Sequence, residues 1–188
     1  MSECGAETLR RAASVHPISA YQIEYSPFSM DIERASSGHL LKTCRELGIA
    51  VVAYCPLGRG MLTGKYASPD DFAEGDFRRA VPRFSRENFP RNMELVEKIR
   101  AVAERKGCTP GQLTLAWMMG QEGVFPIPGT KRIEYLEENV AANEVFEKGL
   151  TEDEMSEVRE AIEKAEVHGT RYPEAMMGGL VKEAPLRQ

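Results

Sequence analysis

The stretch that decides the fold is IAVVAY at Ile49–Tyr54, followed directly by CPLGRG at Cys55–Gly60. A continuous apolar run of this length is typical of a strand that is buried on both faces, as in parallel sheets. Ligands of parallel α/β folds bind at the carboxyl ends of strands, where the glycine-rich segment lies. Gly58 and Gly60 let the backbone approach a ligand, and exposed amides can cradle phosphate oxygens. The alternative is an ordinary glycine-rich turn after a core strand.

Helix and strand patterns alternate on both sides of this run. Further strands are predicted at Ser19–Glu24, where apolar and polar residues alternate, and at Val124–Ile127. Helices are predicted over residues 6–14, from a cap at 36 or 37 to Gly48, and over 92–106, 109–118, 131–143 and 151–166. Residues 55–90 read mostly as a loop whose length favours a functional role. We expect residues 1–166 to form the folded unit and residues 167–188 an irregular tail.

Two helix starts carry a complete capping signature. Thr109 with Gln112, and Thr151 with Glu154, are spaced as capping boxes, in which each side chain satisfies a backbone amide of the other residue. Pro110 occupies the first helical position, where its missing amide hydrogen costs nothing.

The order of these elements predicts the fold class. Strands separated by helices imply right-handed crossovers and a parallel sheet, and therefore an α/β fold. Three strands are too few to close a barrel. A (β/α)8 barrel typically needs ~250 residues, whereas this chain has 188. We therefore expect a piece of a larger fold.

Composition excludes several classes of function. The chain has 24 basic and 29 acidic residues, interspersed, with a net charge of -5. No basic run favours nucleic acid or an anionic membrane as a partner. The longest apolar stretch, residues 49–57, is far too short to cross a bilayer, and the start of the chain lacks the apolar core of a signal peptide. The scattered cysteines form no zinc-site or disulfide pattern, so we expect no metal and a cytoplasmic setting.

A second candidate segment is IPGTKR at Ile127–Arg132, which precedes a predicted helix. A helix N-terminus presents free amides and the positive end of the dipole, which favours anions. Thr130 adds a hydroxyl, and Lys131 and Arg132 add charge, so the segment suits a phosphate monoester. In α/β barrels a phosphate site is often built by the loops after the last two strands. The alternative is a capped helix start with solvated basic residues.

Other polar residues are weaker candidates. Glu138 and Asn139 could read the hydrogen-bonding edge of adenine, or lie on a solvated helix face. Gln22 could bind a carboxamide, or be a polar strand end. Cys55 is better explained by packing than by nucleophilic chemistry, because no base is evident nearby. The histidines suggest no triad or metal site; they are His16, His39 and His168.

Four segments in register resemble the aldo-keto reductase superfamily, from its sixth barrel strand onward. They are QIEYS at Gln22–Ser26, AYCPLGRGMLTGKY at Ala53–Tyr66, TPGQLTLAW at Thr109–Trp117 and IPGTKRIEYLEEN at Ile127–Asn139. GTRYPE at Gly169–Glu174 is similar to the branch near the fungal and bacterial pyridoxal reductases. The resemblance implies strands six to eight of a TIM barrel, with NADP(H) bound in extended form.

The resemblance also implies roles for individual residues. Gln22 and Ser2 would hold the nicotinamide carboxamide and Tyr54 would stack on its ring. The 2′-phosphate would lie near Thr130–Arg132. The full set of implied cofactor-binding positions is Gln22, Tyr54, Cys55, Pro56, Leu57, Gly58, Arg59, Gly60, Lys65, Ile127, Gly129, Thr130, Lys131, Arg132, Tyr135, Glu138 and Asn139. Cys55 replaces a usual serine and Tyr135 a usual arginine or glutamine, which puts the preference for NADP over NAD in question.

The reaction implied is reduction of a small carbonyl compound to an alcohol. In this family the catalytic Asp, Tyr, Lys and His come from strands earlier than those matched, so no catalytic residue is assigned here. We expect this chain alone to be inactive. An N-terminal half or a homodimer would cover its exposed sheet edges. The alternatives are a non-enzymatic nucleotide-sensing or interaction module, and a fragment of a split gene.

Overall fold

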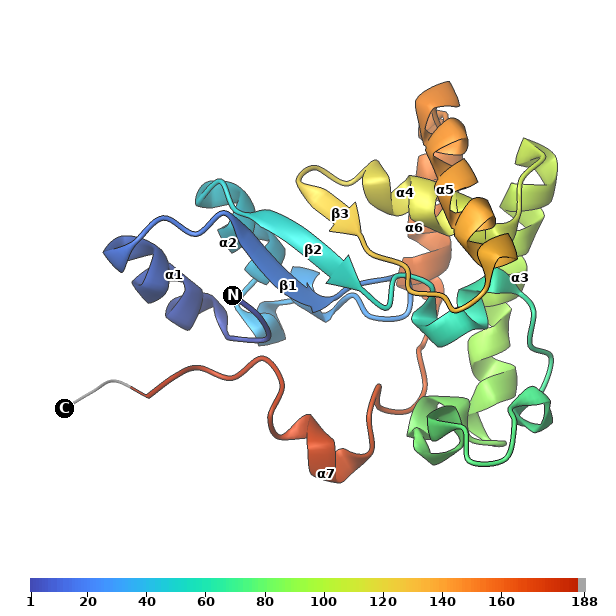
Figure 1. The fold of residues 1–188 in the computed structure, drawn as a ribbon, viewed down its shortest axis with the longest axis horizontal. Coiled ribbons are helices and arrows are strands. Elements are labelled where there is room, and N and C mark those ends of the chain that lie inside the picture. The colour runs from blue at the N-terminus through green and yellow to red at the C-terminus, as the bar shows by residue number, and fades with distance from the viewer. Residues whose placement is uncertain (186–188) are drawn as a thin grey trace.

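The structure, a computed structural model, describes residues 1–185 as an α/β fold on a three-stranded parallel sheet (Figure 1). The strands lie in the order β1 (Ala20–Glu24), β2 (Ala50–Tyr54) and β3 (Val124–Pro126). The predicted strands and their parallel pairing are confirmed. Residues at the start of the chain extend the sheet beyond β1, because Ser2 forms a parallel bridge with Gln22.

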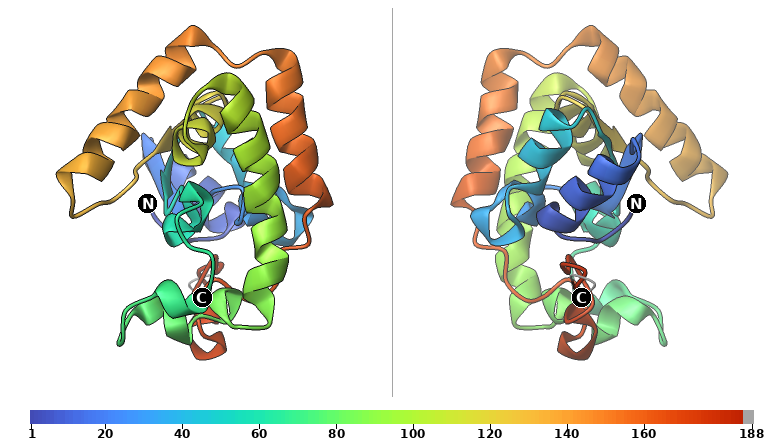
Figure 2. Two further views of the ribbon diagram at one scale, coloured as in Figure 1. Left: turned by 90° about the vertical axis from the view of Figure 1, so that its right-hand side faces the viewer. Right: turned by 90° about the vertical axis from the view of Figure 1, so that its left-hand side faces the viewer.

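The helices gather on one face of the sheet and at its side. They are α1 (Ala6–Val15), α2 (Leu40–Glu46), α3 (Asn88–Lys106), α4 (Pro110–Met119), α5 (Ile133–Lys148), α6 (Glu152–Lys164) and α7 (Glu174–Met177). Helix α2 packs against β2 and α4 against β3, while α5 packs on α4 and α6 on α3. Figure 2 shows α5 and α6 as the outer frame of the molecule. The buried Tyr21, Val51 and Trp117 belong to one hydrophobic core. No helix of the described part is both long and apolar enough to cross a membrane.

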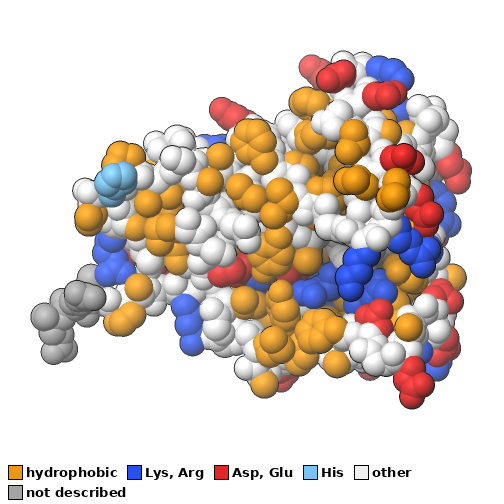
Figure 3. Space-filling view, in the orientation of Figure 1, with side chains coloured by type: hydrophobic (Ala, Val, Ile, Leu, Met, Phe, Trp, Pro, Cys, Tyr) orange, Lys and Arg blue, Asp and Glu red, His pale blue; other side chains and the backbone are white. Residues whose placement is uncertain are grey.

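The other face of the sheet is open. Gln22, Val52 and Phe125 lie opposite one another across the three strands, and the Phe125 side chain is 59% exposed. Figure 3 shows hydrophobic side chains gathered over the strands and over α5. The exposed apolar stripe of α5 consists of Ile133, Leu136 and Val140. Single exposed apolar residues are common on protein surfaces, whereas exposed apolar residues that lie together favour contact with another protein surface.

The helix ends test the capping predictions. Both capping boxes are present: the Gln112 amide donates to the Thr109 hydroxyl at 3.2 Å, and the Glu154 amide to the Thr151 hydroxyl at 3.2 Å. The prediction that Ser36 or Ser37 caps α2 is wrong. Gly38 and His39 both adopt positive φ, 68° and 53°, so the chain turns there and α2 begins at Leu40.

The loop predicted over residues 55–90 is more ordered than its composition suggests. It contains four short 3-10 helices, namely η3 (Gly58–Thr63), η4 (Pro69–Asp71), η5 (Phe77–Ala80) and η6 (Pro82–Phe84). Helix α3 also begins earlier than predicted. The Phe72 ring packs against Tyr66, Phe84 and Phe89, with ring centroids 5.0, 5.7 and 6.1 Å apart. This aromatic cluster gives the loop its own core, which a pattern of glycine, proline and arginine conceals.

The tail after α6 lies along the body of the molecule. It contains the short helix α7 and otherwise follows an irregular path across the bottom of Figure 1 toward the start of the chain. Its backbone pairs with the N-terminal segment, where the Gly5 amide donates to the Lys182 carbonyl at 2.9 Å. Glu183 then accepts hydrogen bonds from the first turn of α1, at Glu7 and Thr8.

Candidate functional site: a cavity after strands β2 and β3

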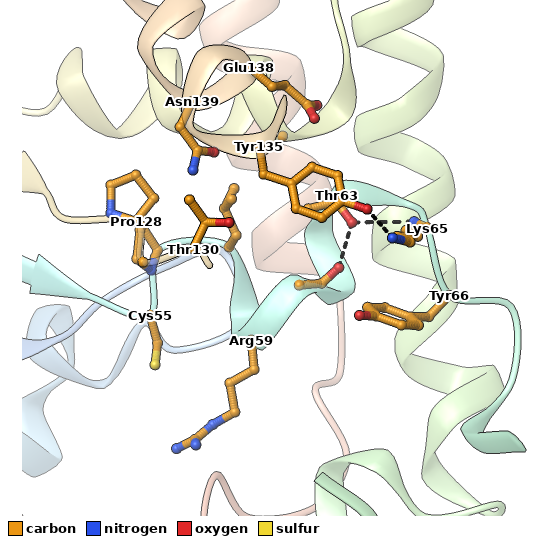
Figure 4. Close-up of a pocket in the computed structure, with 15 residues that line it drawn as sticks. Cys55, Arg59, Thr63, Lys65, Tyr66, Pro128, Thr130, Tyr135, Glu138 and Asn139 are labelled. Carbon is orange, nitrogen blue, oxygen red and sulfur yellow. Dashed lines mark hydrogen bonds between the residues drawn. The ribbon is translucent and has the colours of Figure 1, made fainter. Parts of the chain in front are cut away.

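A cavity of about 410 Å³ lies beyond the carboxyl ends of β2 and β3 (Figure 4). It is lined by Cys55, Pro56, Leu57, Arg59, Gly60, Thr63, Lys65, Tyr66, Gly111, Pro128, Gly129, Thr130, Tyr135, Glu138 and Asn139. The two segments identified in the sequence therefore meet at one site, although they are separated by α3 and α4. The position agrees with the rule that ligands bind where parallel strands end.

The glycine-rich segment forms a tight turn rather than an open amide cradle. Gly58 and Gly60 have φ of 56° and 93°, a region that glycine enters without strain. Their amides donate to the carbonyls of Cys55 and Leu57, both at 2.9 Å, so these two amides are used within the turn. Gly58 itself packs against the Phe28 ring and Leu62 instead of lining the cavity. The glycines thus shape the cavity wall.

The second segment places a helix N-terminus at the cavity. Gly129 and Thr130 line it, and the Thr130 hydroxyl accepts a hydrogen bond from the Arg132 amide at 3.1 Å as α5 begins. Lys131 and Arg132 are exposed beside this end of α5, and Arg132 pairs with Glu134 at 3.2 Å. Their charge and the helix dipole both favour an anion at this position.

Two side chains close one end of the cavity. The Lys65 ammonium, which follows η3, donates to the Tyr135 hydroxyl on α5 and lies 4.6 Å from the centre of its ring. Deeper in the helix, Glu138 accepts a hydrogen bond from the Thr109 hydroxyl at 2.6 Å, which joins α5 to the start of α4. Figure 4 shows Asn139 and Glu138 on the helix above Thr130. Both side chains line the cavity.

Some predicted residues lie elsewhere. Gly58, Ile127, Lys131 and Arg132 border the cavity in sequence without lining it, and Gln22 and Tyr54 lie on the sheet. The cavity is also lined by four residues that are not among the predicted positions, namely Thr63, Tyr66, Gly111 and Pro128. In the sequence, Gly111 is recognisable only as part of the capping box formed by Thr109 and Gln112. Its approach to Glu138, 3.6 Å from an added Cβ, depends on how α4 packs against α5.

The Arg59 side chain points away from the cavity in Figure 4. Its guanidinium lies 4.5 Å from the centre of the Tyr172 ring and 3.9 Å from the Glu24 carboxylate. Only its backbone and the base of its side chain can therefore contribute to the cavity wall. Its charge is directed toward Glu24 and away from the cavity.

A buried group of charged residues, hereafter the ion cluster, lies at the carboxyl ends of β1 and β2. Its members are Glu3, Glu24, Arg59, Arg83 and Arg171. Glu24 and Arg171 are 3% and 5% exposed. The Tyr54 hydroxyl donates to Glu3 at 2.8 Å and accepts from Arg171 at 3.2 Å. No local pattern in the sequence predicts this cluster, because its members are spread from residue 3 to residue 171.

Cys55 lies between the cavity and the ion cluster. Burial raises the pKa of its thiol, as does the negative charge of Glu24, while Arg59 and Arg171 act in the opposite direction. The thiol is therefore protonated near neutral pH, which fits a packing role and opposes a nucleophilic one.

Comparisons with known proteins identify the family. The family model described as "Aldo/keto reductase family" matches residues 1–163. The chain is 53% identical over 186 residues to the aldo-keto reductase yakc of Schizosaccharomyces pombe, whose name includes NADP(+). It is 52% identical over 186 residues to the aldo-keto reductase str7 of Strobilurus tenacellus. Each alignment covers 98% of this chain and 54% of the relative, so the chain spans about half the length of these relatives.

Solved structures agree with this result. A thermostable aldo-keto reductase crystallised with the inhibitor epalrestat is 26% identical, with a TM-score of 0.61 over 85% of this chain and 46% of its own. The glycerol dehydrogenase of Gluconobacter oxydans shares the fold with a TM-score of 0.75, at 24% identity, over 90% of this chain and 50% of its own. The family match and the two relatives together establish that the chain belongs to the aldo/keto reductase family.

Proposed function

We propose that this chain is the cofactor-binding half of an NADP(H)-dependent aldo-keto reductase that reduces a small aldehyde or ketone to an alcohol. The observation that carries the proposal is the cavity after β2 and β3, with the N-terminus of α5 at its side. Its volume of about 410 Å³ falls within the range of small-molecule sites. The nicotinamide ring supplies the hydride, whereas the protein binds and orients the cofactor.

The residues present fit a dinucleotide phosphate in an extended pose. Thr130 and the first turn of α5 would hold the 2′-phosphate, with Lys131 and Arg132 beside it. Glu138 and Asn139 would face the adenine, and the wall from Cys55 to Gly60 would follow the pyrophosphate. The nicotinamide would then lie toward the carboxyl ends of β1 and β2, near Gln22 and Tyr54. The S. pombe relative, with NADP(+) in its name, supports the same cofactor for this chain.

We expect the purified chain to bind NADPH more tightly than NADH. The variant with both Lys131→Ala and Arg132→Ala should lose at least about tenfold in NADPH affinity, because two cations near the 2′-phosphate are removed. Its affinity for NADH should change little. Cofactor fluorescence during titration measures both constants.

A matched control removes two exposed cations elsewhere. Lys42 and Lys148 have side chains that are 77% and 76% exposed, and neither lines the cavity. A variant with Lys42→Ala and Lys148→Ala should bind NADPH like the wild type. Equal losses in the two variants, or no binding by a folded wild type, would contradict the assignment of the cavity.

We expect no carbonyl reduction by this chain alone. Proton transfer to the carbonyl oxygen needs an acid whose pKa lies near the working pH. Burial raises the pKa of Tyr54 well above its usual value, and its hydrogen bond to Glu3 raises it further. Loss of NADPH absorbance with an aldehyde present, by sequence-verified protein, would overturn this expectation. Binding without turnover would also suit a nucleotide-sensing module.

We infer that a second protein surface covers the open side of the molecule. The candidates are the N-terminal half of such a barrel and a second copy of this chain. The exposed stripe Ile133, Leu136 and Val140 on α5 lies next to the open sheet face. The four free cysteines fit a reducing compartment such as the cytoplasm for this assembly.

Replacing Leu136 by glutamate should weaken self-association of the chain. The change places a charge inside the apolar stripe, where an interface would have to desolvate it. Sedimentation velocity should show associated wild type and a shift toward monomer in the variant. Val15, which is 87% exposed on α1, provides the control, because Val15→Glu should leave association unchanged. A monomeric wild type at high concentration would argue against the interface.

A further inference from the structure

We propose that Arg171, in the tail, is a positioning residue that holds Tyr54 and Glu3 in place at the nicotinamide end of the cofactor site. The inference rests on the proposed function and adds a residue from outside the barrel segments to it. The tail would thereby contribute a side chain to the site, at the ion cluster.

The contacts of Arg171 are directed at three different groups. One guanidinium nitrogen lies 3.0 Å from the Glu3 carboxylate. The other lies 3.2 Å from the Glu24 carboxylate and donates to the Tyr54 hydroxyl at 3.2 Å. Because the fork of a guanidinium is planar and rigid, these contacts fix the three partners relative to one another. A lysine at the same position would offer a single point charge.

Tyr54 is clamped from two sides. Its hydroxyl donates to Glu3 at 2.8 Å and accepts from Arg171, while Glu3 also pairs with Arg171. This closed triangle of three side chains fixes the position of the phenol oxygen and so limits the swing of the Tyr54 side chain away from the site. A ring that must stack on a flat heterocycle binds it with less loss of entropy if its orientation is already set.

The tail is anchored on both sides of Arg171, so the guanidinium cannot easily withdraw. Before it, the Asn92 side chain exchanges two hydrogen bonds with the backbone of His168, at 2.8 and 2.9 Å. The Arg83 amide also donates to the Thr170 carbonyl at 3.3 Å. After it, the Tyr172 ring stacks on the Arg59 guanidinium. The cluster is therefore built by the tail as much as by the strands.

The charges of the cluster explain why an arginine is needed. Glu24 is almost fully buried, and a buried carboxylate is stable only when it is paired and hydrogen-bonded. Arg171 approaches it more closely than Arg59 or Arg83, at 3.2 Å against 3.9 Å for each of the others. Removing Arg171 would thus take one partner from both Tyr54 and Glu3 and leave Glu24 with its more distant arginines.

The test separates the two ends of the cofactor. Wild type, Arg171→Met and Arg171→Lys are titrated with NADPH and, separately, with adenosine 2′,5′-bisphosphate, which lacks the nicotinamide. We expect Arg171→Met to weaken NADPH about tenfold and the bisphosphate less than about twofold, since only hydrogen bonds near the nicotinamide are lost. The NADPH affinity of Arg171→Lys should lie between those of the wild type and Arg171→Met. The emission of bound NADPH should also differ in Arg171→Met, because its nicotinamide no longer meets a fixed ring.

Two further variants keep the test independent of folding. Tyr54→Phe removes only the hydroxyl, so it should reproduce the NADPH loss, and combining it with Arg171→Met should add little more. Arg159→Met removes a partly buried arginine on α6 that pairs with Glu33 at 2.8 Å and does not line the cavity. This variant should bind both ligands like the wild type.

Each remaining outcome decides the matter. Unchanged NADPH affinity in both Arg171→Met and Tyr54→Phe would overturn the positioning role while leaving the proposed function intact. Equal loss of NADPH and of the bisphosphate would show a general structural role instead. A folded wild type that binds neither ligand would overturn the proposed function, and the positioning role with it.

Discussion

Glu24→Ala is expected to lower the free energy of unfolding by about 3–5 kcal/mol, because it removes the acidic partner of buried arginines. Arg171 and Arg83 are 5% and 7% exposed, and both approach Glu24. The Nε atom of Arg83 is already buried without a hydrogen-bond partner in the described part of the chain. Without Glu24 the cluster would hold an excess of positive charge that water cannot reach.

Urea unfolding followed by circular dichroism measures this loss. An exposed pair provides the control: Glu46 lies 2.5 Å from Arg10, with both side chains more than 40% exposed. Glu46→Ala should cost far less than Glu24→Ala, because surface ion pairs are screened by solvent. Glu24→Gln keeps the shape of the side chain and loses its charge, so its loss of unfolding free energy should lie between those of Glu24→Ala and Glu46→Ala. Similar costs for Glu24→Ala and Glu46→Ala would mean that water reaches the cluster.

Gly169→Ala is expected to have the second large effect, at the point where the tail meets the loop before α3. Gly169 has a φ of 81°, which costs a residue with a Cβ roughly 1–3 kcal/mol. An added Cβ would also lie 2.6 Å from the backbone nitrogen of Arg83 and from the carbonyl carbon of Pro82. Overpacking against backbone adds roughly another 1–3 kcal/mol, so either the fold loses stability or the tail detaches.

Gly149 separates the two contributions. It has the same φ of 81°, and an added Cβ there would meet nothing within 4 Å. Gly149→Ala should therefore show only the conformational cost. Urea unfolding compares the total stabilities, and limited proteolysis should cut the tail faster in Gly169→Ala than in Gly149→Ala. Identical behaviour of the two variants would show that the tail is not held at Gly169.

Local signals in the sequence carried the prediction of the fold. The apolar run at β2 and the capping boxes at Thr109 and Thr151 depend on neighbours a few residues away, and the structure confirms them. The start of α2 was mispredicted because two successive residues with positive φ, Gly38 and His39, override the serine caps before them. That turn follows from how the chain packs and has no strong local signature.

The candidate site was predicted where it is built from contiguous segments. The walls after β2 and β3 meet as expected, because the ends of parallel strands share one edge of the sheet. The sequence does not predict the ion cluster, because Glu24 ends a strand with no local sign of a partner and Arg171 lies in a tail expected to be irregular. Their pairing depends on the path of the tail, which no periodic pattern in the sequence encodes.

The separation of Arg171 from Glu3, 168 positions along the chain, also sets an order of assembly. Contacts that close so long a segment cost more chain entropy than those between neighbours, so they tend to form late. During synthesis Arg171 leaves the ribosome after β2, β3 and α5. The cavity after β2 and β3 can therefore take shape on a growing chain, whereas the ion cluster is completed only once Arg171 has emerged.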